Sequence, residues 1–171
     1  MTDLTSFIRD IPDFPTPGII FKDITPLLGD QQAFASTVDA LSDHFVGAGA
    51  NRVVGIEARG FIIAAPVAYR LGAGLVPVRK KGKLPYEVRG IDYTLEYGSE
   101  RLEVHSDAVS SGDRVVVIDD VLATGGTARA ACDVLRELGA EIVGVGVVIE
   151  LSFLSGRDAL SDVDVFSLIT Y

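Results

Sequence analysis

The stretch Val115-Val-Val-Ile-Asp-Asp-Val-Leu-Ala-Thr-Gly-Gly-Thr127 decides how this chain folds. The apolar run Arg114–Ile118 predicts a buried strand, and two acids, Asp119 and Asp120, come directly after it where the strand leaves the core. Burying carboxylates without partners is costly, so these two need partners. Sugar hydroxyls or a hard cation would serve.

After the acids, Ala123-Thr-Gly-Gly-Thr127 opens a predicted helix over 127–138. Its backbone N–H groups and the positive end of the helix dipole can surround a phosphate. Gly125 and Gly126 permit the φ values that such a loop requires, and the hydroxyls of Thr124 and Thr127 add donors. The loop lacks the glycine spacing of nucleoside triphosphatases and of dinucleotide-binding folds, so one phosphate plus a diol is the simpler ligand.

The rest of the chain alternates in the same way between short apolar runs and amphipathic stretches. Strands are expected at 52–57, 74–78 and 142–149, with a last one at 163–169, and helices at 30–46 and 61–71. Asp30 is the expected N-cap of its helix, and Gly139 should end the helix over 127–138. This order predicts an α/β fold, a parallel sheet covered on both faces, in a single domain over residues 1–171.

Two segments break this alternation. Pro12-Asp-Phe-Pro-Thr-Pro-Gly18 predicts an ordered but irregular arm within about residues 1–29. The alternation between Tyr86 and His105 predicts a β-hairpin that projects from the sheet, a mobile flap over about residues 84–105.

Composition excludes several classes of partner. The net charge is −9, and the nearest thing to a basic cluster, Arg79-Lys-Lys-Gly-Lys83, is too small for a nucleic-acid footprint but could line a pocket for an anion. No apolar run approaches the ~18 residues of a membrane span. The start of the chain lacks the pattern of a signal peptide, and the single cysteine, Cys132, cannot form an internal disulfide, which favours a reducing, cytoplasmic setting.

The strand, paired acids and Thr-Gly-Gly-Thr loop resemble the signature of type I phosphoribosyltransferases. Further similarity to the adenine branch of that family covers nearly the whole chain: Pro12 to Leu28, Glu57-Ala-Arg-Gly-Phe61, Arg79 to Pro85 and Tyr93-Thr-Leu-Glu-Tyr-Gly98. The resemblance implies the type I phosphoribosyltransferase fold, a central mostly parallel sheet flanked by helices, with an N-terminal hood and a β-hairpin flap.

The resemblance also implies roles for particular residues. Asp119 and Asp120 would hold the ribose hydroxyls, and Ala123, Thr124, Gly125, Gly126 and Thr127 the 5′-phosphate. Phe21 of the hood would stack on the base, with contacts from Ile20 and Lys22. Arg59, assisted by Arg79 and Lys83, would bind the diphosphate, Glu96 would assist proton transfer near N7 of the base, and Tyr97 would cover the reaction centre. On the residues alone, Phe21 could instead be core, Arg59 a surface ion-pair partner, and Glu96 an exposed strand residue.

The expected reaction forms AMP and diphosphate from adenine and 5-phosphoribosyl diphosphate, with Mg²⁺ arriving on the substrate and a homodimer as the assembly. One alternative is a 6-oxopurine enzyme, which typically places a Lys near the strand after the phosphate helix; this chain has no Lys beyond Lys83. Another is a regulator that senses phosphoribosyl diphosphate without turning it over. A third is an α/β domain with a purely structural role.

Overall fold

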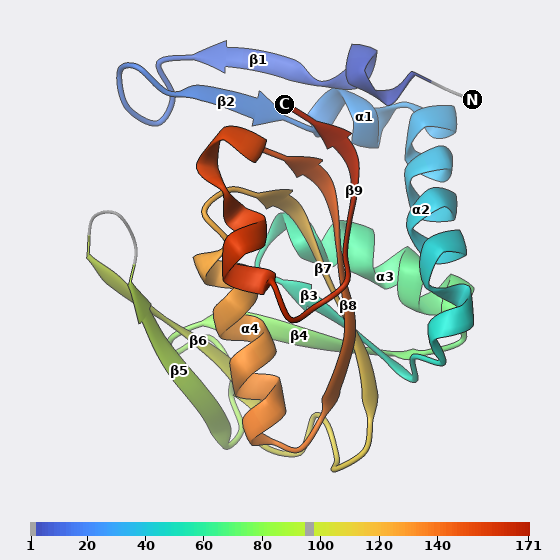
Figure 1. Cartoon of the computed structure of the whole chain (residues 1–171), viewed down its shortest axis with the longest axis vertical. Coiled ribbons are helices and arrows are strands. Elements are labelled where there is room, and N and C mark those ends of the chain that lie inside the picture. Colours follow the sequence, from blue (N-terminus) through green and yellow to red (C-terminus); the bar gives the residue numbers. More distant parts are fainter. Residues whose placement is uncertain (1–2, 95–97) are drawn as a thin grey trace.

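A mostly parallel sheet forms the centre of the computed structural model, which describes residues 3–94 and 98–171 (Figure 1). Within these residues the strand order is β5-β6-β4-β3-β7-β8-β9. The strands are β3 (Arg52–Ile56), β4 (Gly74–Lys80), β5 (Val88–Thr94), β6 (Ser99–His105), β7 (Arg114–Leu122), β8 (Glu141–Glu150) and β9 (Val165–Thr170). From β4 through β9 the neighbours run parallel, whereas β6 is antiparallel to both β4 and β5. The predicted parallel sheet is confirmed.

Helices cover both faces of the sheet, as the apolar runs predicted. Helix α4 (Gly126–Glu137) packs on one face, while α2 (Gln31–Phe45) and α3 (Arg59–Leu71) pack on the other. Alternate residues of β7 serve the two cores, because successive side chains of a strand point to opposite faces: Val115 and Val117 face α4, and Val116 and Ile118 face α2 and α3. Shorter elements are α1 (Thr25–Gly29), η1 (Leu4–Phe7), η2 (Val46–Ala48), η3 (Ser152–Leu154) and η4 (Gly156–Leu160).

The predicted helix ends agree with the structure. Asp30 caps α2, with its carboxylate accepting hydrogen bonds from the N–H groups of Gln32 and Ala33, and Gly139 follows α4 in the left-handed region with φ +91°. The side chain of Cys132 is fully buried in the core. None of the helices in the described part of the chain has the length and apolar content that a membrane crossing requires.

Strand β7 is longer than predicted. The expectation that it ends at Ile118 was wrong, since Val121 and Leu122 continue the parallel pairing with Ile149 and Glu150 of β8. Asp119 and Asp120 therefore lie within the strand, on a backbone fixed by sheet hydrogen bonds, rather than on a loop beyond it.

The N-terminal arm contains two strands that the sequence did not predict. β1 (Arg9–Pro12) and β2 (Ile20–Asp23) form a separate antiparallel ribbon, which we call the hood, lying across the carboxyl ends of the central strands (Figure 1). The irregular conformation was predicted correctly only for the loop between them. In this loop Asp13 has φ +56°, and its carboxylate accepts a hydrogen bond from the N–H of Gly18 at 2.8 Å.

Candidate active site

A cavity of about 530 Å³ lies between the hood and the carboxyl ends of β3 and β7. In an open parallel sheet this edge is where ligands bind. Ten of its lining residues were predicted as site residues: Ile20, Phe21, Arg59, Asp119, Asp120, Ala123, Thr124, Gly125, Gly126 and Thr127. The structure thus brings the predicted base, ribose and phosphate groups to one place.

The loop between β7 and α4 forms one wall of this cavity. Gly125 is the N-cap of α4 and has φ +86°, a conformation that favours glycine. A Cβ on Gly125 would also collide with the carbonyl oxygen of Gly156 and lie 2.9 Å from Ala159 Cβ. Gly126 is the first residue of the helix and is not among the glycines with positive φ, so the prediction that it supplies an unusual φ was wrong. The first N–H groups of an α-helix have no partner within the helix, and Gly126 and Thr127 line the cavity, so this helix start suits an anion.

The side of this loop that faces away from the cavity packs against the start of η4, which no sequence pattern marked as part of the site. Gly156, buried at the start of η4, lies so close to Ala123 that an added Cβ would collide with the Ala123 carbonyl oxygen. Arg157 fixes the segment by donating to both oxygens of the buried Glu150 at the end of β8, at 2.7 and 2.8 Å. These contacts hold the loop's backbone in place from behind.

The two acids have different surroundings. Asp119 is partly buried, and its Oδ1 accepts a hydrogen bond from the backbone N–H of Asp120 at 2.9 Å. Burial and the neighbouring charge of Asp120 raise the pKa of Asp119 well above its ordinary range. Asp120 is 5% exposed, and its Oδ2 lies 2.5 Å from Arg59 Nε but accepts no hydrogen bond within the described residues. The contact with Arg59 is therefore an ion pair that does not meet hydrogen-bond geometry, and this oxygen is buried beneath the arginine.

Arg59 connects the acids to the hood. It is the first residue of α3, directly after the cis peptide between Glu57 and Ala58, and its guanidinium carbon lies 4.9 Å from the centre of the Phe21 ring. The adjacent Gly60 allows α3 to approach β7 closely, since a Cβ there would lie 2.9 Å from Asp119 Oδ1. Arg59 therefore forms an ion pair, with Asp120. The alternative expectation was an ion pair on the surface, whereas this one lines the cavity.

Two predicted diphosphate ligands lie outside the cavity lining. Arg79 Nε and Lys83 Nζ contact the carboxylate of Glu57 at 3.3 and 3.1 Å, and that carboxylate also accepts the N–H of Lys80. Burial alone would raise the pKa of Glu57, but the Lys80 N–H and the two cations outweigh it and lower the pKa. Among the cations of residues 79–83, Lys80 at the end of β4 lines the cavity, although the sequence did not mark it as a site residue.

The hairpin of β5 and β6 adds two further residues that were missed, Tyr93 and Glu100. The Tyr93 hydroxyl donates to Glu100 Oε2 at 2.8 Å, and Lys80 Nζ lies 3.1 Å from Glu100 Oε1. Burial, with a further contribution from the Glu100 carboxylate, raises the pKa of Tyr93 to about 12. The predicted flap residues Glu96 and Tyr97 fall outside the described residues.

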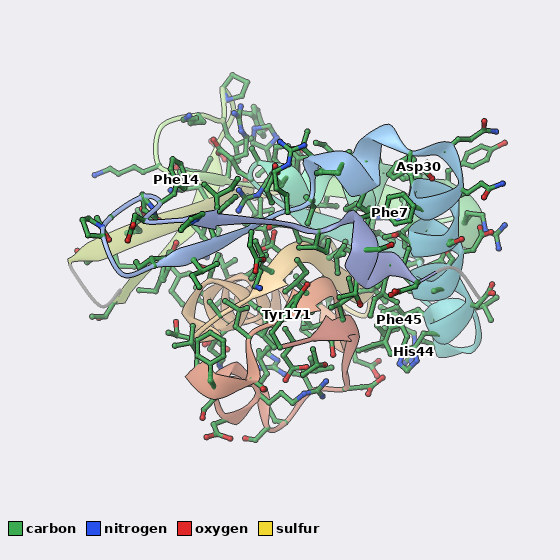
Figure 2. The ribbon with its side chains drawn as sticks, turned by 90° about the horizontal axis from the view of Figure 1, so that it is seen from above. Phe7, Phe14, Asp30, His44, Phe45 and Tyr171 are labelled. Atoms are coloured by element: carbon green, nitrogen blue, oxygen red, sulfur yellow. The ribbon has the colours of Figure 1, made fainter. Side chains whose placement is uncertain are left out.

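The hood places two of its three predicted residues on the cavity. Phe21 lines it and packs edge-on against Phe14, with ring centres 5.2 Å apart, and Ile20 is 56% exposed beside it. Lys22 turns away: its ammonium lies 2.7 Å from Asp10 and 3.8 Å from the centre of the Tyr171 ring. Figure 2, which looks down on the hood, shows Phe14 near the loop of the ribbon and Tyr171 beside its strands, farther from the loop. Lys22 thus connects the hood to Tyr171, the residue directly after β9.

Comparison with known proteins agrees with this geometry. Residues 28–169 match the phosphoribosyl transferase domain. Over 98% of this chain and 89% of its relative, the sequence is 58% identical to an adenine phosphoribosyltransferase of Frankia casuarinae. The chain belongs to the adenine phosphoribosyltransferase family. An adenine phosphoribosyltransferase of Chloroflexus aurantiacus is 56% identical over 99% of this chain and 98% of its own length.

The three-dimensional comparison places the fold in the same family. The crystal structure of adenine phosphoribosyltransferase from Thermoanaerobacter pseudethanolicus superimposes with a TM-score of 0.96 at 48% identity, covering 99% of this chain and 98% of that one. The predicted type I phosphoribosyltransferase fold is confirmed.

Proposed function

We propose that this member of the adenine phosphoribosyltransferase family joins adenine to 5-phosphoribosyl diphosphate, forming AMP and diphosphate. The observation that carries the proposal is the single cavity in which a phosphate-type loop, two acids, an arginine and an aromatic hood residue meet. A purely structural domain would leave these groups without a ligand.

The loop and the two acids on one wall of the cavity support a binding place for the sugar phosphate. The 5′-phosphate would bind the N–H groups and hydroxyls of Ala123 to Thr127 at the start of α4. The ribose hydroxyls would donate to Asp119 and Asp120, whose backbone is fixed within β7. A ribose held at both ends presents its anomeric carbon to the remaining space, where the base and the diphosphate must lie.

The diphosphate would lie near the cations on the opposite wall. Arg59 and Lys80 line the cavity, while Glu57 holds Arg79 and Lys83 beside them. Direct diphosphate contacts from Arg79 and Lys83 therefore require them to leave Glu57. These cations would stabilise the charge that the leaving group gains as its bond to the anomeric carbon breaks.

We propose Mg²⁺ as the cofactor, arriving with the substrate. Among residues 3–94 and 98–171 no group of three or more metal-ligating side chains gathers, so no all-protein cage forms in that part of the chain. Mg²⁺ prefers oxygen ligands, which the diphosphate and ribose oxygens of the substrate and water would supply; no protein ligand is assigned. When bound, the ion would neutralise diphosphate charge.

The base would stack on Phe21, with Ile20 beside it. N9 of adenine would attack the anomeric carbon as diphosphate departs, and the base loses a proton in the same reaction. Glu96 is proposed to meet the base near N7 and assist this proton transfer, and Tyr97 to cover the reaction centre. If so, Glu96→Gln should lower kcat at least tenfold with little change in KM for adenine; an unchanged kcat would remove Glu96 from the chemistry.

The direct test supplies the purified protein with phosphoribosyl diphosphate, Mg²⁺ and, in parallel, adenine, hypoxanthine, guanine or xanthine. AMP as the main product supports the proposal. IMP, GMP or XMP would keep the phosphate and ribose assignments but discard the role of the hood in choosing adenine. Binding of the sugar diphosphate with no product would favour a sensor instead.

A homodimer and a cytoplasmic setting are part of the proposal. Support for a dimer comes from Ile62 and Tyr69, which lie seven residues apart on one side of α3 and are 47% and 88% exposed. A subunit packed on this side of α3 would cover both side chains. Light scattering after size-exclusion chromatography measures the assembly, and a monomer at micromolar concentration would contradict it.

A further inference from the structure

An acidic side chain lines a cavity that must hold a strongly anionic substrate. Glu100 is partly buried in this wall, although its carboxylate repels phosphate and diphosphate groups. Such a residue weakens the binding of an anionic substrate, so its place in this wall calls for a functional explanation.

The strand register explains how Glu100 comes to face the cavity. Glu100 pairs directly with Tyr93 of β5, and two residues along β6, Leu102 pairs with Lys80 of β4. Since alternate residues of a strand share a face, all four side chains point to the same side, and all four line the cavity. The strand pairing therefore fixes the position of Glu100 on the cavity wall.

The carboxylate is held in a fixed orientation. Tyr93 donates its hydroxyl to one oxygen at 2.8 Å, and the Lys80 ammonium lies 3.1 Å from the other. These contacts outweigh the effect of burial and lower the pKa of Glu100, so it is ionised at neutral pH.

We propose that Glu100 is a positioning residue for Lys80: it pairs with the Lys80 ammonium when the site is empty and releases it to the diphosphate when substrate binds. In the free enzyme Lys80 pairs with Glu100; when diphosphate is bound, Lys80 turns to it, and Glu100 keeps its bond to Tyr93. When diphosphate leaves, Glu100 accepts Lys80 again. The inference rests on the proposed contact between Lys80 and the diphosphate.

This exchange sets how tightly diphosphate is held. A lysine without a partner in the free enzyme would bind the diphosphate group more strongly, and the product would leave more slowly. A competing carboxylate lowers the affinity for both the substrate's diphosphate and the released product. The charge of Glu100 therefore favours turnover over affinity.

The test measures the binding of inorganic diphosphate with Mg²⁺ by calorimetry, together with steady-state kinetics. Glu100→Gln keeps the size of the side chain and an oxygen acceptor for Tyr93 but removes the charge. It should bind diphosphate about three- to tenfold more tightly, lower KM for phosphoribosyl diphosphate and lower kcat, with the affinity for ribose 5-phosphate unchanged. Glu100→Asp, which keeps the charge, should return the diphosphate affinity toward that of the parent.

Asp92→Asn is the matched control. Asp92 is a neighbour of Tyr93 on the same hairpin, its side chain is 73% exposed, it pairs with Arg101 and it does not line the cavity. The same charge is thus removed outside the site, and diphosphate affinity should not change. An equal effect of Asp92→Asn and Glu100→Gln would mean that general charge explains the result, and an unchanged or weaker diphosphate affinity in Glu100→Gln would overturn the proposal.

Lys80→Met tests the contact between Lys80 and diphosphate separately from the role of Glu100. Weaker diphosphate binding in this variant supports the contact between Lys80 and diphosphate, whatever Glu100 does. Parent-like diphosphate binding in Lys80→Met would remove that contact and with it the exchange.

Discussion

Replacing Gly60 by alanine tests how closely α3 approaches β7 beside the acids. Gly60 is in the first turn of the helix, where alanine is favoured over glycine by up to ~1 kcal/mol. The added Cβ, however, would lie 2.9 Å from Asp119 Oδ1 and 3.0 Å from the Ile118 carbonyl oxygen. Ordinary contact begins at 3.4 Å, so the helix must move about 0.4 Å away from the Ile118 carbonyl oxygen, and the Asp119 carboxylate must shift as well. Overpacking of this kind costs about 1–3 kcal/mol, which exceeds the gain in helix propensity.

Gly60→Ala should therefore lower the free energy of unfolding by about 1–2 kcal/mol, measured by urea denaturation. The displaced Asp119 should lower kcat/KM for phosphoribosyl diphosphate on the order of tenfold, because misplacement by ~1 Å can cost about 100-fold. Gly29→Ala is the control, since Gly29 is also helical but has no atom within 4 Å of an added Cβ. If Gly60→Ala is as stable as Gly29→Ala and retains the parent's kcat/KM, the reasoning is refuted.

Three further substitutions test other parts of the site. Because the folded-state pKa of Asp119 is raised, the stability it contributes is present below its ordinary value of 3.8 and is lost as pH rises through the folded pKa. Asp119→Asn should thus raise Tm at pH 7, by a margin that shrinks toward pH 4, while raising KM for phosphoribosyl diphosphate; a lower Tm at pH 7 would contradict this. Phe21→Ala should raise KM for adenine roughly tenfold, as stacking contributes about 1–3 kcal/mol, and an equal rise in KM for the sugar diphosphate would argue against stacking. Arg157→Met leaves the Glu150 carboxylate buried without its cation and should lower the free energy of unfolding by about 2–3 kcal/mol, much of which Glu150→Gln should restore in the double variant; parent-like denaturation of the single variant would refute this.

The sequence predicted those parts of the site that depend on local pattern. Asp119, Asp120 and the loop to Thr127 are contiguous, so one strand followed by one helix was enough to place them together. Their position at the carboxyl end of a parallel strand followed from the alternation of strands and helices. The hood strands were missed because three prolines and a glycine dominate that stretch, while the pairing of β1 with β2 depends on residues on either side of it.

The side chains that were misjudged depend on register between distant segments. Among the cations of residues 79–83, the alternation along β4 carried a usable signal: Val76 and Val78 face the core, and Lys80 continues their face toward the cavity, whereas Arg79 does not. Glu100 could be placed only once the pairing of β5, β6 and β4 was known. No pattern near Gly156 indicated that it packs against the loop between β7 and α4, because that contact joins residues more than 30 positions apart.

The hood's construction affects how the family's reaction can be selective. Its two strands pair only with each other among the described residues, and an isolated two-stranded ribbon is marginally stable in water. The fastening of Lys22 to Tyr171 secures one end, while Phe14 and Ile20 remain half exposed at the other. A purine stacked on Phe21 would add apolar contact to the ribbon, so base binding would be coupled to local ordering of the N-terminal arm. A base that fits less well would then bind more weakly for two reasons: its own contacts would be poorer, and the arm above it would be less ordered.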